Sequence, residues 1–406
     1  MPCVCIYFQI HQPFRLRRYS VFDTDRHYFD DHRNAEICRK VANKCYLPAT
    51  AMLLDMIRRH EGRFRLGFSL TGMVLDQFEA YAPEVIQSFQ RLAETGCVEF
   101  LAETYYHSLA FLYSREEFIE QVELHQRRIQ SLFGGTAPVF RNTELVYNNE
   151  LAETAHQLGY RAILADGAEH VLGRRSPNCV YTAPGAPIRV LLKNARLSDD
   201  LAFRFSNRNW AEWPLSIEKY VSWINRAGET GPVVNLFMDF ETIGEHQWKD
   251  TGIFDFFEQL PAEVLRHAGN SFKTPSEAAA AFEPAGQFDC PHLISWADTE
   301  RDLSAWLGNA MQSNALKELY ALEAAVKSTG DEQLLRDWRL LQSSDHFYYM
   351  CTKYFADGDV HKYFNPYESP YDSYINFMNV LDNVTLRSRP VRVGIVSGPA
   401  PVPPSS

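Results

Sequence analysis

The sequence lacks the cysteine spacing of a metal ribbon or a disulfide scaffold. No two of its eight cysteines form a C-x-x-C pair, which argues against a zinc ribbon or a thioredoxin-like motif. A chain of 406 residues can bury a core large enough to need no disulfide framework. We therefore expect reduced, mostly buried thiols in a cytoplasmic protein. The cysteines are Cys3, Cys5, Cys38, Cys45, Cys97, Cys179, Cys290 and Cys351.

Long apolar runs and basic runs are also missing. No stretch approaches the roughly 18 apolar residues that a membrane helix needs. The short apolar run at the N-terminus ends at His11, which does not fit a signal peptide. With a net charge of −11 and no basic cluster, the chain is a poor candidate for binding nucleic acid or an anionic membrane. A neutral or cationic partner fits better.

What is present is an ordinary globular composition with many aromatic residues. Hydrophobic residues make up 46% and charged residues 22% of the chain, enough for a sizeable core. Aromatic residues reach 13%; most should pack in that core, and the others could stack on the apolar faces of sugar rings. The Pro-rich end of the chain, residues 391–406, is predicted to be a disordered tail.

Short, continuous apolar runs recur through the first two-thirds of the chain and predict buried parallel strands. Helical periodicity between them is clearest at 83–93, 116–133 and 217–227. Strands that alternate with helices indicate βα units closing into a barrel. We count seven strands, one fewer than the common eight. The strand ranges are 4–10, 66–70, 98–101, 139–141, 162–165, 188–192 and 233–237.

After about residue 290 the pattern becomes purely helical. Leu303, Trp306, Leu307 and Ala310 follow helical spacing, and Thr299 is predicted to be the N-cap of that helix. Further helices are expected at 334–341 and 374–386, and 275–291 should be the segment that crosses over. The predicted fold is therefore α/β: an incomplete seven-stranded (β/α)7 barrel, residues 1–289, followed by a C-terminal helical subdomain, residues 290–390, that closes the active site.

Polar and acidic residues gather where the predicted strands end. In parallel barrels the working groups lie at the carboxyl ends of the strands, and four of the seven ends carry an acid. This clustering predicts an active site built from carboxylates. The residues in chain order are His11, Thr71, Glu99, Glu103, Glu144, Asp166, Asn194, Asp239 and Glu241.

Two of these acids are suited to opposite roles in cleaving a glycosidic bond, which requires one ionised carboxylate and one protonated carboxyl. Glu144 follows Arg141, whose charge could keep it ionised, so it is predicted to be the nucleophile. Asp239 lies between apolar neighbours and is predicted to be the acid/base. Glu241, two residues on, should face the same side of an extended strand, and the crowding of like charges would raise one pKa.

Six short motifs, in order and across almost the whole chain, resemble those of glycoside hydrolase family 57. That resemblance implies retaining hydrolases and transferases acting on α-glucans, on an incomplete seven-stranded barrel followed by helices, with Glu144 and Asp239 as the catalytic pair. We expect no cofactor and no metal. The motifs are His11-Gln12-Pro13, Gly96–Leu101, Arg141-Asn142-Thr143-Glu144-Leu145, Met238–His246, Ser295–Asp302 and Ser344-Asp345-His346-Phe347.

Further residues are candidates for binding substrate, each with a structural alternative. Histidines after strand ends could bond sugar hydroxyls or serve the core. Trp296 could be a sugar platform, and Asp298 beside it could bond a hydroxyl or cap a helix. Glu241 could orient substrate or satisfy buried backbone groups. The candidates are His11, Glu99, His107, Glu241, His246, Trp296, Asp298, Asp345 and His346.

The function predicted from these residues is a retaining hydrolase of α-1,4-glucans, of the α-amylase type. A 4-α-glucanotransferase or a glucan branching enzyme would use the same residues. A second class is a metal-dependent polysaccharide deacetylase, although no H-x-x-x-H spacing occurs. A third is a non-catalytic carbohydrate-binding protein, against which the intact pair of acids argues. The candidate metal ligands for the second class are His11, His107, Asp166, Asp239 and His246.

Overall fold

The first of two sheets combines three strands from residues 3–100 with two from residues 233–272. The computed structural model describes residues 1–353 and 365–389, so the predicted tail at 391–406 lies outside the described residues. All pairings in this sheet are parallel, in the order β3-β2-β1-β8, with β9 also paired to β1. Its strands are β1 (Cys3–Ile10), β2 (Leu66–Leu70), β3 (Val98–Phe100), β8 (Val233–Asp239) and β9 (Ser271–Phe272).

The second sheet has the order β4-β5-β7-β6. Its pairings are parallel except for β6 with β7, which form a hairpin. The turn of that hairpin contains Gly185, whose φ of 76° is readily adopted only without a Cβ. The strands are β4 (Val139–Phe140), β5 (Ala162–Asp166), β6 (Val180–Ala183) and β7 (Ala186–Lys193).

The two sheets are joined at two places. Beyond β3, Ala102 pairs with Phe140 of β4 in a parallel bridge. At the other side the Asn194 N–H donates to Asn235 O of β8 at 2.9 Å, and the Asn235 side chain donates to Leu192 O of β7 at 2.8 Å. The space between the sheets is filled by buried apolar side chains from both, with two alanines from helix α11 (Pro275–Ala281).

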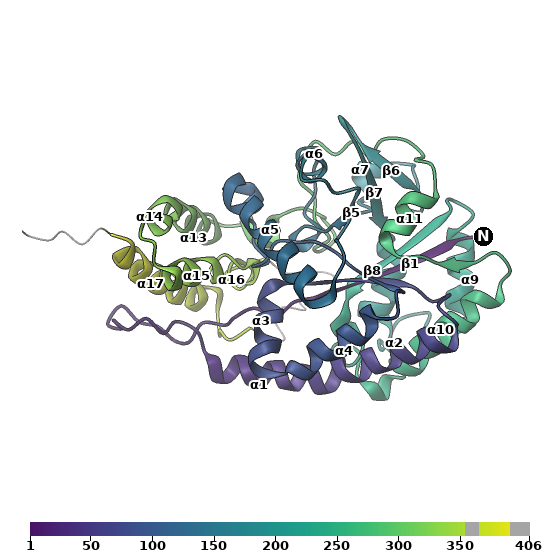
Figure 1. Ribbon diagram of the computed structural model, residues 1–406, viewed down its shortest axis with the longest axis horizontal. Coiled ribbons are helices and arrows are strands. Elements are labelled where there is room, and N and C mark those ends of the chain that lie inside the picture. The colour runs from purple at the N-terminus through teal and green to yellow at the C-terminus, as the bar shows by residue number, and fades with distance from the viewer. Residues whose placement is uncertain (354–364, 390–406) are drawn as a thin grey trace, which may run out of the picture.

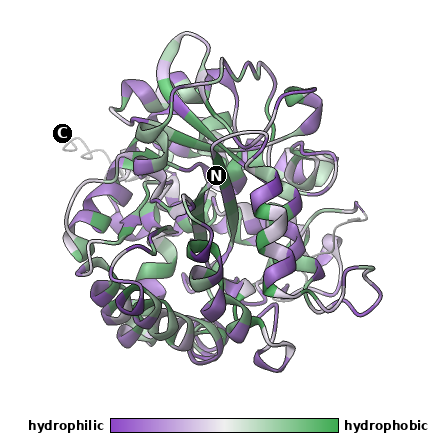
Figure 2. Cartoon of the chain, turned by 90° about the vertical axis from the view of Figure 1, so that its right-hand side faces the viewer, coloured by the Kyte–Doolittle hydropathy of each residue, from purple (hydrophilic) through white to green (hydrophobic). Residues whose placement is uncertain are grey.

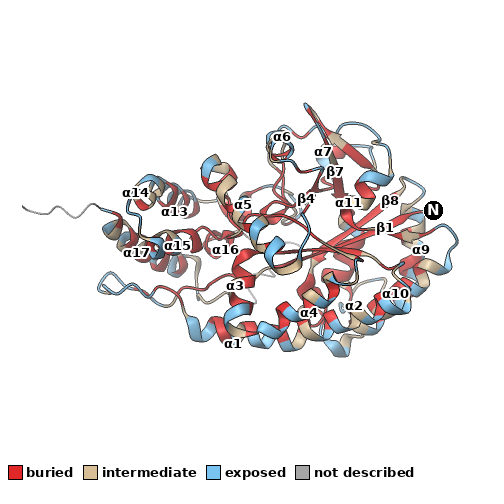
Figure 3. Ribbon diagram, viewed as in Figure 1, coloured by how far each residue is buried: buried red, intermediate tan, exposed pale blue. Residues whose placement is uncertain are grey.

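Amphipathic helices cover the outer face of the first sheet (Figures 1 and 2). In α4, for example, Val85, Ile86, Phe89 and Leu92 are buried, and the opposite face is polar. The strands beneath are almost fully buried, which matches their continuous apolar sequences (Figure 3). These helices are α1 (Asp31–Val41), α2 (Leu47–Arg59), α3 (Gly72–Tyr81), α4 (Pro83–Ala93), α9 (Ile217–Ala227) and α10 (Ile253–Arg266).

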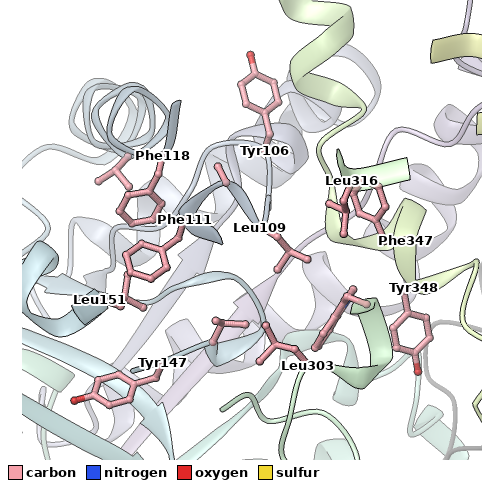
Figure 4. Close-up of a cluster of buried hydrophobic side chains, with 14 of the residues drawn as sticks. Tyr106, Leu109, Phe111, Phe118, Tyr147, Leu151, Leu303, Leu316, Phe347 and Tyr348 are labelled. Carbon is pink, nitrogen blue, oxygen red and sulfur yellow. The ribbon is translucent and has the colours of Figure 1, made fainter. Parts of the chain in front are cut away.

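The second sheet is covered by α5 (Arg115–Phe133), α6 (Asn149–Gln157) and the helices that follow residue 303, which we call the helical region. One continuous hydrophobic cluster joins them, from Phe118 of α5 and Tyr147 to Leu316 and Phe347 (Figure 4). The helical region thus shares its core with the sheet beneath it. Its helices are α12 (Ser304–Leu307), α13 (Ala310–Ala321), α14 (Glu323–Ser328), α15 (Glu332–Leu340), α16 (Ser344–Tyr348) and α17 (Pro370–Ser388).

Short helical turns complete the described elements, several of them beside the ends of strands. They are α7 (Glu169–Leu172), α8 (Ala195–Asp199), the π-helices η1 (Ala42–Tyr46) and η4 (Asp200–Arg204), and the 3-10 turns η2 (Ala110–Leu112), η3 (Thr143–Leu145), η5 (Phe240–Thr242) and η6 (Lys249–Thr251).

All seven predicted strands are confirmed, as are the helices predicted at 83–93, 116–133 and 217–227. The prediction missed β6 and β9. The N-cap at Thr299 was wrong: turns occupy residues 298–303, and the longer helix α13 is capped by Asn309 in a capping box with Gln312. The predicted crossing segment begins with the helix α11. No helix within the described ranges is long and apolar enough to cross a membrane.

Candidate active site

One pocket opens at the carboxyl ends of β1, β4, β7 and β8 and holds both predicted catalytic acids. Glu144 enters it from the turn after β4, and Asp239 from the last position of β8. The loop around Trp296 and the helix α16 line the remaining side. The two acids, 95 residues apart in the chain, therefore share one cavity, as the strand-end argument predicts.

Glu144 is held by two hydrogen-bond donors. His107 Nε2 lies 3.0 Å from Glu144 Oε1, and the Trp296 indole N–H donates to Oε2 at 2.8 Å. The residue is only 4% exposed. Its backbone has φ 56° and ψ 26°, a left-handed conformation that is costly for a residue with a Cβ. The fold thus maintains a strained turn to aim this carboxylate.

His107 links Glu144 to a second buried acid. Its other ring nitrogen, Nδ1, lies 3.5 Å from Glu103 Oε2, and the residue is 2% exposed. Burial lowers its pKa, but the two carboxylates outweigh burial and raise the pKa of His107 to about 9. Arg141, the cation expected beside Glu144, also lines the pocket, with Nη1 3.9 Å from Glu103 Oε2. Its guanidinium nitrogens have no hydrogen-bond partner among the described residues.

Asp239 and Glu241 are arranged differently from the extended pair that was expected. The strand ends at Asp239, and Phe240–Thr242 turn into the 3-10 helix η5, so the extended geometry was wrong. Both side chains still line the pocket. Glu241 is 4% exposed and accepts a hydrogen bond from the Tyr46 hydroxyl. Burial, with the charge of Asp239, raises the pKa of Glu241 to about 8.

A loop at residues 295–302 closes one side of the pocket and brings in Trp296. Both Arg141 and Lys193 place their cations about 5 Å from its ring centroid, at 5.1 and 5.2 Å. Arg301 ties the loop to the strand ends, with Nη2 3.2 Å from Asp199 Oδ2. Asp298, 9% exposed, lies 3.0 Å from Lys353 Nζ. Ion pairs at Asp298 and Arg301 therefore anchor the loop.

Seven of the nine predicted substrate-binding residues line this pocket, and two do not. Glu99 was predicted from the motif at 96–101, but β3 turns its carboxylate toward the start of α11, where it accepts the Ser276 N–H at 2.9 Å. His346 is buried against Phe377 inside the helical region, and burial lowers its pKa to about 4. The seven are His11, His107, Glu241, His246, Trp296, Asp298 and Asp345.

Several lining residues gave no signal in the sequence. Lys193 and Asp199 form a buried ion pair at 2.7 Å. Lys193 ends the apolar run of β7, which could have suggested it, but Asp199 ends the short helix α8 and has no such signal. Phe203, 38% exposed, belongs to the π-helix η4, and nothing in its flanking sequence sets it apart. Tyr348 and Tyr349 reach the pocket only because α16 packs over it.

The candidate metal ligands are not gathered into a metal-binding group. Among residues 1–353 and 365–389, no three His, Cys, Asp or Glu side chains are placed to hold a metal ion together. His11 faces Asp345 and Thr71, and His107 faces the two glutamates. Asp166 is fully buried beside Arg301 at 3.8 Å. The chemistry that this arrangement supports is that of paired carboxylates.

Comparison with known proteins places these observations in a family. The model of "Glycosyl hydrolase family 57" matches residues 5–291. A protein of Methanocaldococcus jannaschii that carries the provisional name alpha-amylase is 41% identical over 388 residues, covering 92% of this chain and 82% of that protein.

Solved structures share the fold at low sequence identity. The branching enzyme of Pyrococcus horikoshii has a TM-score of 0.66 at 14% identity, over 94% of this chain and 88% of that one. The 4-alpha-glucanotransferase of Thermococcus litoralis has a TM-score of 0.64 at 15% identity, over 86% of this chain. This chain spans 56% of the length of that transferase.

Proposed function

This chain belongs to glycosyl hydrolase family 57, and we propose that it is a retaining hydrolase of α-1,4-glucans of the amylase type. The observation that carries the proposal is the convergence of Glu144 and Asp239 in one pocket at the carboxyl ends of β4 and β8. The name of the 41% identical relative supports the same activity. In this proposal Glu144 is the nucleophile and Asp239 the acid/base.

The fold would be an incomplete barrel that places Glu144 and Asp239 at the carboxyl ends of its strands. We propose that one seven-stranded wall is formed by β1, β2, β3, β4, β5, β7 and β8, joined between β3 and β4 and between β7 and β8. Residues 1–289 would be the catalytic barrel, and the helices up to residue 389 would close its mouth. Support comes from the apolar interior, in which side chains of both sheets meet those of α11.

The reaction would proceed by double displacement. A Glu144 carboxylate oxygen attacks the anomeric carbon while Asp239 gives its proton to the departing glycosidic oxygen, so one C–O bond forms as another breaks. Water then attacks the same carbon and passes a proton to Asp239, and Glu144 leaves as a carboxylate. The donors at 3.0 and 2.8 Å would stabilise the charge that returns to Glu144 in the second step.

The substrate would lie between the strand ends and the loop at 295–302. His11, His246, Asp298 and Asp345 line that space and could bond sugar hydroxyls. Phe203, partly exposed and in the same lining, offers an apolar face for a sugar ring. Trp296 remains a predicted platform, although its N–H is engaged by Glu144.

Removing the nucleophile tests the assignment. Glu144→Ala should reduce hydrolysis of maltooligosaccharides by at least about 10³-fold, because no covalent intermediate can form. With an activated α-maltosyl substrate, added azide should restore turnover and give a glycosyl azide of inverted configuration. Asp239→Asn with azide should give the retained configuration. Near wild-type turnover in Glu144→Ala would refute the assignment.

Incubation with maltoheptaose separates hydrolysis from transfer. Hydrolysis gives only shorter products, because water resolves the intermediate. Products longer than seven glucose units would show that a sugar hydroxyl resolves it instead, and would make the chain a glucanotransferase with the same catalytic pair. Product lengths measured by chromatography at several substrate concentrations decide between them.

A further inference from the structure

His107 lies between two buried carboxylates, a position that favours a protonated ring. One ring nitrogen faces Glu144 Oε1 at 3.0 Å and the other faces Glu103 Oε2 at 3.5 Å. A neutral imidazole has one N–H and would turn a lone pair toward one of these carboxylates. An imidazolium presents an N–H on each nitrogen, so that one donates to Glu144 and the other lies within ion-pair distance of Glu103 without a hydrogen bond. The residue is 2% exposed, so bulk water does not screen the three charges.

The backbone fixes this arrangement from both sides. His107 has φ 49° and Glu144 has φ 56°, so both partners in the hydrogen bond lie in the left-handed region, where residues with a Cβ are uncommon. The carbonyl of His107 accepts the Ser344 N–H of α16 at 2.9 Å. A hydrogen bond from the helical region therefore holds the backbone of His107, the residue that contacts Glu144.

A second histidine is stacked on the first. The His11 and His107 rings lie 3.9 Å apart between centroids, at an angle of 21°. His11 Nε2 is 2.8 Å from Asp345 Oδ2, and Nδ1 is 3.0 Å from Thr71 Oγ1. A neutral tautomer satisfies both contacts, since Nε2–H can donate to Asp345 while the Thr71 hydroxyl donates to Nδ1. Two positive rings at this distance would repel, so the stack holds one charge.

The charge resides on His107. Burial opposes it, but the flanking carboxylates raise the pKa of His107 to about 9, while burial and the charge of His107 lower the pKa of His11. His125, the other histidine beside Glu103, is neutral. His125 of α5 accepts the Glu103 N–H and donates to Leu70 O, which is a neutral ring. Arg141 is a further cation near Glu103. The acids that line the pocket besides Glu144 are Asp199, Asp239, Glu241, Asp298 and Asp345.

We propose that His107 is a positioning residue whose ring stays positively charged throughout turnover and so holds Glu144 ionised. Glu103 stabilises the charged form of the His107 ring. The proposal rests on the function proposed above, in which Glu144 is the nucleophile. No proton moves from His107 in either step. Its positive charge favours the Glu144 carboxylate before attack and again when the glycosyl ester is hydrolysed.

The pH dependence of kcat/KM tests the proposal, because two variants should move opposite limbs. His107→Gln removes the positive charge beside Glu144, so the acidic limb, set by the nucleophile, should move up by about 1–3 pH units. Glu103→Gln leaves His107 charged at acidic pH but weakens its hold on the proton. In that variant the acidic limb should stay at or below its wild-type position, and the alkaline limb should move down.

A matched control is His346→Gln, which replaces another buried histidine that does not line the pocket. Both limbs should stay where they are. If His107→Gln lowers kcat/KM equally at every pH, with the acidic limb unmoved, His107 is merely structural and the proposal is overturned.

A measurement that does not need activity separates this proposal from the proposed function. Nuclear magnetic resonance of histidine-labelled protein, with the His107 signal assigned from its absence in His107→Gln, should show a charged ring at pH 7. The ring should titrate near pH 9, and at lower pH in Glu103→Gln. A neutral His107 ring at pH 7 overturns the proposal. A charged ring in an enzyme that cleaves no α-glucan would overturn the proposed function instead.

Discussion

At the scale of single residues, the nucleophile depends on the group that donates to its second oxygen. The Trp296 indole donates to Glu144 Oε2 at 2.8 Å. Trp296→Phe keeps an aromatic ring near Arg141 and Lys193 but removes the donor. We expect kcat/KM to fall about 10- to 100-fold, because a hydrogen bond to a charged group is worth about 1.5–3 kcal/mol.

The control is Trp306→Phe in the helical region. Trp306 is fully buried, and its indole nitrogen has no hydrogen-bond partner in the described part of the chain. This variant should be less stable but should keep its kcat/KM under folded conditions. Equal losses of kcat/KM in Trp296→Phe and Trp306→Phe would mean that Trp296 acts through packing alone.

Glu241 should make stability depend on pH. Its pKa is raised by burial and by Asp239 to about 8, so the folded protein retains a proton that the unfolded chain releases above about pH 4.5. The stabilisation is complete below that pH and is lost as the pH rises toward 8. In Glu241→Gln, stability should depend less steeply on pH over this range.

Thermal unfolding of both proteins between pH 4.5 and 8 measures the effect. The melting temperature of the wild type should fall more steeply than that of Glu241→Gln. Glu283→Gln, an exposed control, should keep the wild-type slope. Parallel curves for wild type and Glu241→Gln would show that Glu241 titrates as it does in the unfolded chain.

At the scale of elements, a buried ion pair joins α5 to α15. Glu117 of α5 is fully buried and accepts two hydrogen bonds from Arg339 at 2.9 and 3.0 Å. Lys327 lies 3.2 Å from the same carboxylate. Glu117→Gln would leave Arg339 with less of its counter-charge, and we expect the free energy of unfolding to fall by about 3 kcal/mol.

Glu123→Gln on the same helix is the matched control. Its pair with Arg127 spans 3.6 Å, and both side chains are more than half exposed. An exposed pair contributes about 0–1 kcal/mol, so urea unfolding of this variant should resemble that of the wild type. If the two variants unfold at the same urea concentration, the cluster contributes little to the attachment of the helical region.

Most of the elements could be predicted from the sequence. The strands and α4, α5 and α9 carry local signals: a continuous apolar run, or apolar residues spaced by one helical turn. The errors lie where distant contacts decide. Residues 298–303 contain a good capping sequence, yet Arg301 and Asp298 are drawn into ion pairs with Asp199 and Lys353, and the helix begins later.

At the scale of the whole molecule, the proposed chemistry requires two carboxylates and no metal. We therefore expect hydrolysis of maltooligosaccharides to be unchanged after dialysis against EDTA. Release of reducing sugar before and after dialysis measures this. A loss that an added divalent metal reverses would contradict the proposal and return the metal-dependent hypothesis.

The sequence alone determined which acids could serve, because an apolar run followed closely by Glu144 and another that ends at Asp239 are local patterns. It also determined the family through the order of its motifs. The tertiary structure alone decided the electrostatics. The rings of His11 and His107 meet from turns 96 residues apart, and Trp296 reaches Glu144 across 152. Such contacts depend on how sheets, loop and helices close around one cavity, and no local property of the chain encodes that closure.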